Sequence, residues 1–170
     1  MNGILIVLEG IDGCGKSTQA SILHKHLIDK GYASMLLREP GDTIVGEGIR
    51  HLLKANRDQA TDTTQIDSSH SIDPMSELLL FSAARVELIN SKLHPALLDG
   101  KIVVCDRFTP STIAYQGYGR GLPIDTIYQV NDLATTGLRP HLVILLDVHP
   151  NDGIRRTADR HEEEGHRRFE

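Results

Sequence analysis

Short apolar runs alternate along the chain with longer segments of helical periodicity. Each run is long enough for one strand, at 4–8, 33–37, 102–105 and 142–147, and the first is rich in β-branched residues. Apolar positions three and four apart predict helices at 17–30, 44–54, 74–98, 109–116 and 124–136, and Pro150 begins a last helix. Strands that alternate with helices of this length are typical of parallel βαβ units. The pattern therefore predicts an α/β fold with a parallel sheet covered by helices on both faces.

Residues 58–73 interrupt this pattern. They hold four aspartates among threonines and serines and contain no lysine or arginine, which predicts a mobile acidic loop. The segments on either side continue one alternating pattern, and 170 residues give room for about one domain. We therefore expect a single domain over residues 1–170 with this loop inserted in it.

Composition and charge restrict the classes of protein. Apolar residues make up 39% of the chain and charged residues 24%, which excludes collagen, a coiled-coil rod and wholesale disorder. The formal charge of -5 gives no basic excess for non-specific nucleic-acid binding, so any polyanion must be held by a local site. No apolar run is long enough to span a bilayer, and residues 1–4 lack the cationic start of a secretory signal. We expect a soluble cytoplasmic protein without nucleic-acid or membrane partners.

Residues 10–17 form a complete phosphate-binding motif. The segment Gly-Ile-Asp-Gly-Cys-Gly-Lys-Ser fits G-x-x-x-x-G-K-[ST], with a predicted strand before it and a predicted helix after it. The glycines let successive backbone N–H groups point at phosphate oxygens, and the helix N-terminus adds unpaired donors. Lys16 is expected to reach the β- and γ-phosphates and Ser17 to bind Mg²⁺. The motif indicates a nucleoside triphosphate site, whereas a glycine-rich turn that matches by chance is the alternative. For Cys14 we favour a small residue that contributes its backbone N–H over a reactive thiol.

Charged residues follow the second and third predicted strands. Asp106 and Arg107 come directly after the third strand, where a carboxylate can orient Mg²⁺ and a guanidinium can bridge two phosphates. The alternative is a salt-bridged pair at a strand end. Arg38 and Glu39 end the second strand, and Arg85 lies in the helical segment after it. Because ligands bind at the carboxyl ends of parallel strands, these charges would surround the phosphate site and accept a nucleoside monophosphate.

The chain resembles the thymidylate kinases, a branch of the nucleoside monophosphate kinases. Five blocks match in order and span residues 4–148, and the block from Asp106 to Gly117 is the most specific. The blocks are Glu9-Gly10-Ile11-Asp12-Gly13 with Gly15-Lys16-Ser17-Thr18; Arg38-Glu39-Pro40-Gly41; Leu79-Leu80-Phe81-Ser82-Ala83 with Arg85; Asp106-Arg107-Phe108 through Ser111 to Ala114-Tyr115-Gln116-Gly117; and the strand Leu142 to Asp147.

The resemblance implies a fold, a reaction and a set of catalytic residues. The fold would be the P-loop three-layer α/β/α arrangement, in a homodimer to which the helix from about Met75 to Leu98 contributes. The reaction would be Mg²⁺-dependent transfer of the ATP γ-phosphoryl group to dTMP, giving dTDP and ADP. The catalytic residues would be Lys16, Asp106, Arg107 and Arg160, and the metal-binding residues would be Ser17, Glu39 and Asp106. The residues that bind ATP would be Gly10, Ile11, Asp12, Gly13, Cys14, Gly15, Lys16, Ser17 and Thr18.

The resemblance also implies how dTMP is held. Phe81 would stack on thymine, and Arg85 would donate to the base O4, where cytosine carries a donor and is rejected. Gln116 offers both a donor and an acceptor to the base edge. The other contacts would be Arg50 and Arg107 to the monophosphate, Asp12 to the 3′-hydroxyl, Tyr115 beside the 2′ carbon, Thr112 near the base, and Glu39 near the Mg²⁺ waters.

Three features depart from or extend this pattern. Some members carry an arginine in the P-loop where this chain has Gly13, so the catalytic arginine would come from a lid at 150–170, with Arg155, Arg156, Arg160 and Arg168 as candidates. Ala84 stands where the family usually has Asp or Asn, so we expect Arg85 to be oriented more loosely. The resemblance implies a further strand and helices beyond the lid, whereas the sequence ends at Glu170.

Two alternatives to this function stay open at this point. One is a kinase for another nucleotide or for a deoxynucleoside, because the P-loop does not specify the acceptor. The other is a nucleotide-binding protein that does not turn over.

Overall fold

The computed structural model describes residues 3–60 and 72–167, and the side chains of residues 3–54 and 72–158. Four parallel strands form one sheet in the order β2-β3-β1-β4. The strands are β1 (Ile4–Glu9), β2 (Ser34–Arg38), β3 (Ile102–Asp106) and β4 (Leu142–Leu145). The predicted α/β class and parallel sheet are confirmed. The single-domain assignment stays a prediction.

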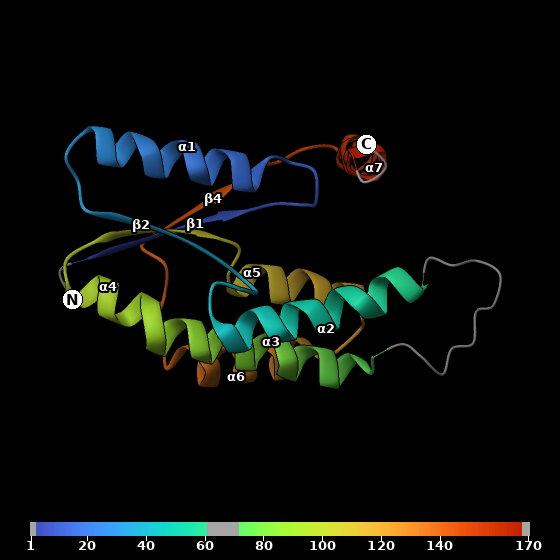
Figure 1. Ribbon diagram of the computed structural model, residues 1–170. Helices are drawn as coiled ribbons and strands as arrows, with labels where there is room; N and C mark the ends of the chain where they lie inside the picture. The colour runs from blue at the N-terminus through green and yellow to red at the C-terminus, as the bar shows by residue number, and fades with distance from the viewer. Residues whose placement is uncertain (1–2, 61–71, 168–170) are drawn as a thin grey trace.

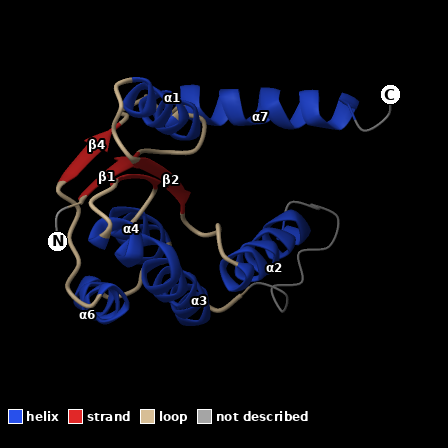
Figure 2. Cartoon of the chain, turned by 60° about the vertical axis from the view of Figure 1, so that its left-hand side comes forward, coloured by secondary structure: helices blue, strands red, loops and turns tan. Residues whose placement is uncertain are grey.

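Helices cover both faces of the sheet, as Figures 1 and 2 show. On one face α1 buries Ala20 with Leu8 and Val104, and on the other a larger core joins Leu88, Leu93 and Leu97 to the strands. The helices are α1 (Lys16–Asp29), α2 (Ile44–Ala60), α3 (Pro74–Leu88), α4 (His94–Leu98), α5 (Thr109–Thr112), α6 (Ile124–Thr135) and α7 (Pro150–Arg167). The predicted three-layer arrangement is therefore present.

The helix predicted at 74–98 contains a π-helical segment. It runs as α3, then η2 (Ile89–Leu93), then α4, and Asp73 caps its start by accepting from the backbone N–H groups of Met75 and Ser76. The helix predicted at 109–116 likewise becomes η3 (Ile113–Gly119) after α5. A π turn inserts one extra residue, so it shifts the side chains that follow it, and apolar periodicity does not reveal it.

Two boundaries differ from the sequence prediction. Helix α2 continues to Ala60, so residues 58–60 are helical, and no glycine or proline stands there to end the helix. The rest of the predicted acidic loop, at 61–71, lies outside the described residues. Strand β4 ends at Leu145 and pairs with β1 alone, so Leu142, Val143 and Leu145 are exposed rather than buried. A strand beyond β4 is not present among the residues that the structure describes.

Candidate active site

The phosphate-binding motif forms a loop between β1 and α1. Gly10, Gly13 and Gly15 have φ values of 144°, 80° and 95°, in the region that favours glycine, so they allow the tight turn. Lys16 is only 6% exposed, and its ammonium donates to the carbonyl oxygens of Gly10 at 2.9 Å and Ile11 at 2.7 Å. No side chain caps the N-terminus of α1, so no capping side chain competes with a ligand for the backbone N–H groups of its first turn. The predicted strand–loop–helix context of the motif is present.

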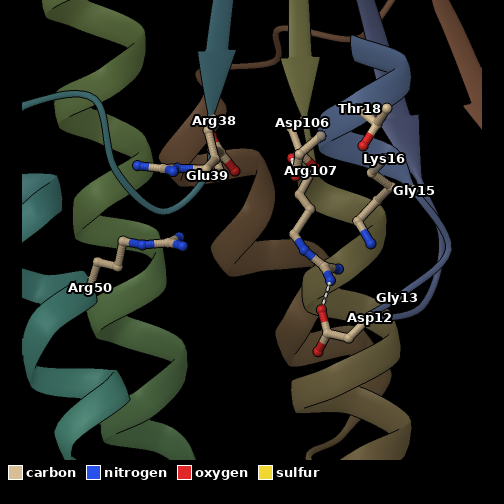
Figure 3. Close-up of a pocket in the computed structure, with 11 residues that line it drawn as sticks. Asp12, Gly13, Gly15, Lys16, Thr18, Arg38, Glu39, Arg50, Asp106 and Arg107 are labelled. Atoms are coloured by element: carbon tan, nitrogen blue, oxygen red, sulfur yellow. Dashed lines mark hydrogen bonds and ion pairs between the residues drawn. The ribbon is translucent and has the colours of Figure 1, made fainter. Parts of the chain in front are cut away.

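A pocket of about 380 Å³ lies in front of this loop. Its lining has four cationic and three anionic side chains, whereas the whole chain carries a charge of -5. Figure 3 shows Lys16 and Arg107 extending into this space, with Arg50 coming from the opposite side on α2. The charged lining residues are Lys16, Arg38, Arg50, Arg107, Asp12, Glu39 and Asp106. This local excess of positive charge suits a polyanion. It agrees with the expectation that an acidic chain can hold a polyanion only at a local site.

Asp106 and Ser17 lie together at the carboxyl ends of β3 and β1. The Ser17 hydroxyl donates to Asp106 Oδ2 at 2.5 Å, while Asp106 Oδ1 is buried without a hydrogen-bond partner. Glu39 also has a buried oxygen without a partner. Hard oxygen donors of this kind fit Mg²⁺, which usually takes one or two carboxylates and completes its shell with phosphates and water. Among the described residues no group of three or more His, Cys, Asp or Glu side chains forms a metal cage.

Arg107 is held in a strained backbone conformation and points at the P-loop. Its φ is 72°, which non-glycine residues rarely adopt. The guanidinium forms an ion pair with Asp12, donates to Ser111 Oγ at 3.0 Å and lies 5.3 Å from the centre of the Tyr115 ring. The Tyr115 hydroxyl is 3.5 Å from Asp12 Oδ2. Asp106 contacts Ser17 and does not pair with Arg107. The alternative interpretation of these two residues, an Asp106–Arg107 ion pair at the strand end, is therefore not observed.

Glu9 sets the turn that carries Arg107, and sequence reasoning gave it no role. Its carboxylate accepts from the backbone N–H of Phe108 at 2.8 Å and from the Ser111 hydroxyl at 2.7 Å. Burial raises the pKa of Glu9, and these hydrogen bonds offset part of the effect. An acidic residue at the end of a buried strand, directly before the P-loop, was the signal available in the sequence.

Arg38 lies at the phosphate site, as its place at the end of the second predicted strand led us to expect, although the family resemblance gave it no binding role. It lines the pocket and pairs with Glu47 at 2.9 Å, and its Nε is buried without a partner. Arg50 reaches the same pocket, and its guanidinium donates to the carbonyl oxygen of Pro40 at 3.0 Å. Burial lowers the pKa of Arg50, and the nearby positive charge of Arg38 adds to the effect. Two guanidiniums placed side by side in this way favour an anion between them.

Arg85 is buried in a ring of acceptors, so the expectation of a loosely oriented Arg85 is wrong. Its Nε donates to Glu39 at 2.8 Å, and its two terminal nitrogens donate to Asn131 Oδ1 at 2.7 Å and Thr112 Oγ1 at 2.9 Å. Asn131 comes from α6 and supplies the support that Ala84 does not. Three of the five N–H groups of the guanidinium make these bonds, which leaves two for a ligand.

The other predicted base-binding residues, Phe81 and Gln116, do not line the pocket. Phe81 is half-buried on α3, one turn before Arg85. Gln116 on η3 is 3% exposed and donates to Glu77 at 2.6 Å. Of the other predicted substrate-binding residues, Arg85 contacts the pocket-lining Glu39 through an ion pair, and Tyr115 stacks on the pocket-lining Arg107.

The buried carboxyl of Glu39 predicts a pH-dependent stability. Desolvation by burial raises the pKa of Glu39 above its ordinary value of 4.5, although Arg85 opposes the shift. The folded chain therefore binds this proton more tightly than the unfolded chain, and the contribution of Glu39 to stability falls as pH rises above 4.5. We expect the unfolding free energy of the wild type, minus that of Glu39→Gln, to decrease from pH 4.5 towards neutrality. Urea unfolding of both proteins across this range measures it, and a difference independent of pH would contradict it.

The start of α7 touches the P-loop. A Cβ placed on Gly13 would lie 2.2 Å from the carbonyl oxygen of Gly153, and one placed on Gly153 would lie 2.6 Å from the carbonyl oxygen of Asp12. A P-loop arginine at position 13 would therefore collide with this helix. Of the lid candidates, Arg155 is exposed and pairs with Asp152 at 3.0 Å, and Arg156 is exposed. The side chains of Arg160 and Arg168 lie outside the described set.

Comparison with known proteins agrees with this geometry. The family model described as thymidylate kinase matches residues 8–170. A curated thymidylate kinase of Geotalea daltonii is 45% identical over 159 residues, which are 93% of this chain and 69% of the relative. The thymidylate kinase of Dehalococcoides mccartyi is 46% identical over 156 residues, or 92% of this chain and 70% of the relative. The crystal structure of thymidylate kinase from Ehrlichia chaffeensis superposes with a TM-score of 0.74 at 36% identity, covering 97% of this chain and 87% of that one. The chain therefore belongs to the thymidylate kinase family.

Proposed function

We propose that the protein transfers the γ-phosphoryl group of ATP to dTMP, giving dTDP and ADP. The observation that carries the proposal is the pocket in which the P-loop lysine faces Arg38, Arg50 and Arg107. A triphosphate and a monophosphate brought together in one site need positive charge on both sides of the transferred group. Family membership favours dTMP over other acceptors and favours turnover over binding alone.

The protein acts by positioning and by charge stabilisation. Lys16 and the backbone N–H groups of residues 10–18 hold the triphosphate, and Arg50 and Arg107 hold the acceptor phosphate. Arg107 already points at the P-loop, so it faces the place where negative charge spreads in the transition state. Asp12 and Tyr115 lie against this guanidinium, on the side where the sugar of the acceptor would lie.

We propose Mg²⁺ as the metal, with Ser17 and Asp106 as its protein contacts and Glu39 acting through water. The support is the Ser17–Asp106 contact together with the buried, unpartnered oxygens of Asp106 and Glu39. When bound, the ion neutralises charge on the β- and γ-phosphates. Asp106 orients the Ser17 hydroxyl, and Glu39 fixes Arg85.

For the lid we propose Arg160 as the catalytic arginine. Gly153 and Thr157 lie one turn apart on the face of α7 that meets Gly13. Position 160 follows Thr157 by three residues and Gly153 by seven, so it lies on the same face of the helix. Arg155 is directed elsewhere, towards Asp152.

Arg85 should set the choice of base, and Arg85→Lys tests this. Lysine keeps a positive charge beside Glu39 but cannot donate to Asn131 and Thr112 in the same fork geometry. We expect the KM for dTMP to rise and the preference over dCMP to fall, by about 1–3 kcal/mol in kcat/KM. Steady-state kinetics with both nucleotides measure it.

Arg85→Ala should in addition destabilise the fold by about 3–5 kcal/mol, because the Glu39 carboxylate stays buried without its partner. Unchanged kinetics for both nucleotides in Arg85→Lys would remove Arg85 from the base site.

We also propose that the protein is a homodimer, which the family resemblance implies. The proposal is supported by the helical segment from Pro74 to Leu98, which exposes the apolar side chains of Met75, Leu79 and Val86. Analytical ultracentrifugation should give a mass near twice 18.8 kDa. A monomer at high protein concentration would contradict this.

A cytoplasmic location, without nucleic-acid or membrane partners, stays a prediction. It is supported by the acidic net charge and by two cysteines that are buried and free. None of the described helices is both long enough and apolar enough to cross a membrane.

The experiment that tests the function is an ADP-release assay with a panel of acceptors. With ATP and Mg²⁺ present, dTMP should give rapid ADP release, whereas dCMP and thymidine should give little. Faster release with another nucleotide or with a deoxynucleoside would support the first alternative. Nucleotide binding without ADP release from any acceptor would support a protein that does not turn over.

A further inference from the structure

Glu77 lies on the helix face that carries the predicted base-binding residues. It precedes Phe81 by four residues and Arg85 by eight on α3, and positions four apart lie on one face of a helix. Its side chain is largely buried, and it does not line the phosphate pocket. Nothing in the phosphoryl-transfer machinery described above uses this carboxylate.

The carboxylate of Glu77 is shared between Gln116 and Arg120. Gln116 Nε2 donates to Glu77 Oε1 at 2.6 Å, and the Arg120 guanidinium donates to Glu77 Oε2 at 2.5 Å. An ionised carboxylate can only accept hydrogen bonds, so the amide of Gln116 must turn its nitrogen towards Glu77. The amide oxygen of Gln116 is then directed away from Glu77 and is available as an acceptor.

An acceptor in this place distinguishes one pyrimidine from another. Thymine and uracil carry a proton on N3 and donate from it, whereas N3 of cytosine has a lone pair. An amide oxygen therefore bonds to thymine at N3 and repels cytosine, while an amide nitrogen would do the reverse. With the amide free to flip, Gln116 could serve either base.

We propose that Glu77 is a positioning residue for base selection, which fixes the amide of Gln116 so that its oxygen accepts the N3 proton of thymine. The inference rests on the proposed function, since it takes Gln116 to lie at the edge of the bound base. Arg85 would recognise O4 of the base, and Glu77 would act through Gln116 at N3. Two nearby atoms of the base are then recognised by separate residues. A competing explanation is that Glu77 only ties α3 to η3 through its ion pair with Arg120.

Equilibrium binding without ATP separates the two explanations. The affinities of the full chain for dTMP, dUMP and dCMP are compared in the wild type, in Glu77→Gln and in Arg120→Gln. Glu77→Gln keeps the shape but removes the carboxylate, and we expect the preference for dTMP over dCMP to fall about tenfold. The preference for dTMP over dUMP should not change, because both bases carry the N3 proton. Arg120→Gln keeps the carboxylate against Gln116, so both preferences should stay as in the wild type.

Several results would overturn the inference. The first is a dTMP-to-dCMP preference that stays unchanged in Glu77→Gln. The second is a loss of the dTMP-to-dUMP preference in Glu77→Gln that equals its loss of the dTMP-to-dCMP preference. The third is a loss of base preference in Arg120→Gln that matches the loss in Glu77→Gln. If Glu77→Gln does not fold, Glu77→Asp replaces it, because a carboxylate withdrawn by one methylene should lower the same preference. A wild type that binds dTMP and dCMP equally would also overturn it. Because these are binding ratios, a wild type that prefers dTMP but transfers no phosphoryl group would refute the proposed function and leave this inference standing.

Discussion

Lys16→Ala should lower kcat for phosphoryl transfer to dTMP by about a thousandfold or more. The ammonium is buried in the P-loop and is held by the carbonyl oxygens of Gly10 and Ile11, so it is preorganised for the phosphates. No other described lysine lines the pocket, and water cannot supply a fixed charge in its place. Single-turnover measurement of dTDP formation at saturating ATP and dTMP gives the rate.

The matched control is Lys25→Ala, which removes an exposed lysine from the same helix. It should keep the wild-type rate. Circular dichroism should show that Lys16→Ala is folded, because the loop backbone keeps its own turn and α1 starts from the same residues. Turnover by folded Lys16→Ala at the wild-type rate would mean that the P-loop is not the phosphate site.

Arg107→Ala should lower kcat by about a hundredfold to a thousandfold, with a smaller rise in the KM for dTMP. The contacts of Arg107 strengthen as negative charge develops on the transferred phosphoryl group. Removing them therefore destabilises the transition state more than the bound substrate. The backbone at residue 107 has a left-handed φ of 72°, which arginine and alanine both disfavour, so the substitution removes the guanidinium without adding backbone strain. Arg107→Lys keeps a charge without the planar fork and should recover only part of the rate.

Arg139→Ala is the control for Arg107, since it removes an exposed arginine with one ion pair, to Asp132. It should leave kcat and KM unchanged. If Arg107→Ala raised only KM, Arg107 would be a binding residue for dTMP and not part of the chemical step. Steady-state kinetics over a range of dTMP concentrations decide between these outcomes.

Local motifs and strand ends were the features that the sequence made predictable. The P-loop is a continuous segment between a strand and a helix, so its conformation follows from its own glycines. Asp106 and Arg107 were placed correctly near it because parallel strands present their carboxyl ends at one edge.

Contacts between distant buried polar residues were not predictable in the same way. Asn131 meets Arg85 across 46 positions and Glu77 meets Gln116 across 39, and neither pair has a spacing that the sequence could reveal. The π turn of η3 also shifts the side chains that follow it, which apolar periodicity does not reveal. The pairing of Arg107 with Asp12, rather than with its neighbour Asp106, depends on the left-handed turn that Glu9 stabilises.

The central claim is that this chain moves the γ-phosphoryl group of ATP onto dTMP, and isotope transfer tests it most directly. The wild-type chain is incubated with ATP labelled on the γ-phosphate, Mg²⁺ and dTMP, and the nucleotides are separated by chromatography. We predict that the label moves into dTDP, with one ADP formed for each dTDP, and that Lys16→Ala does not produce labelled dTDP. Label released as inorganic phosphate, or label that stays in ATP while dTMP is present, would contradict the claim.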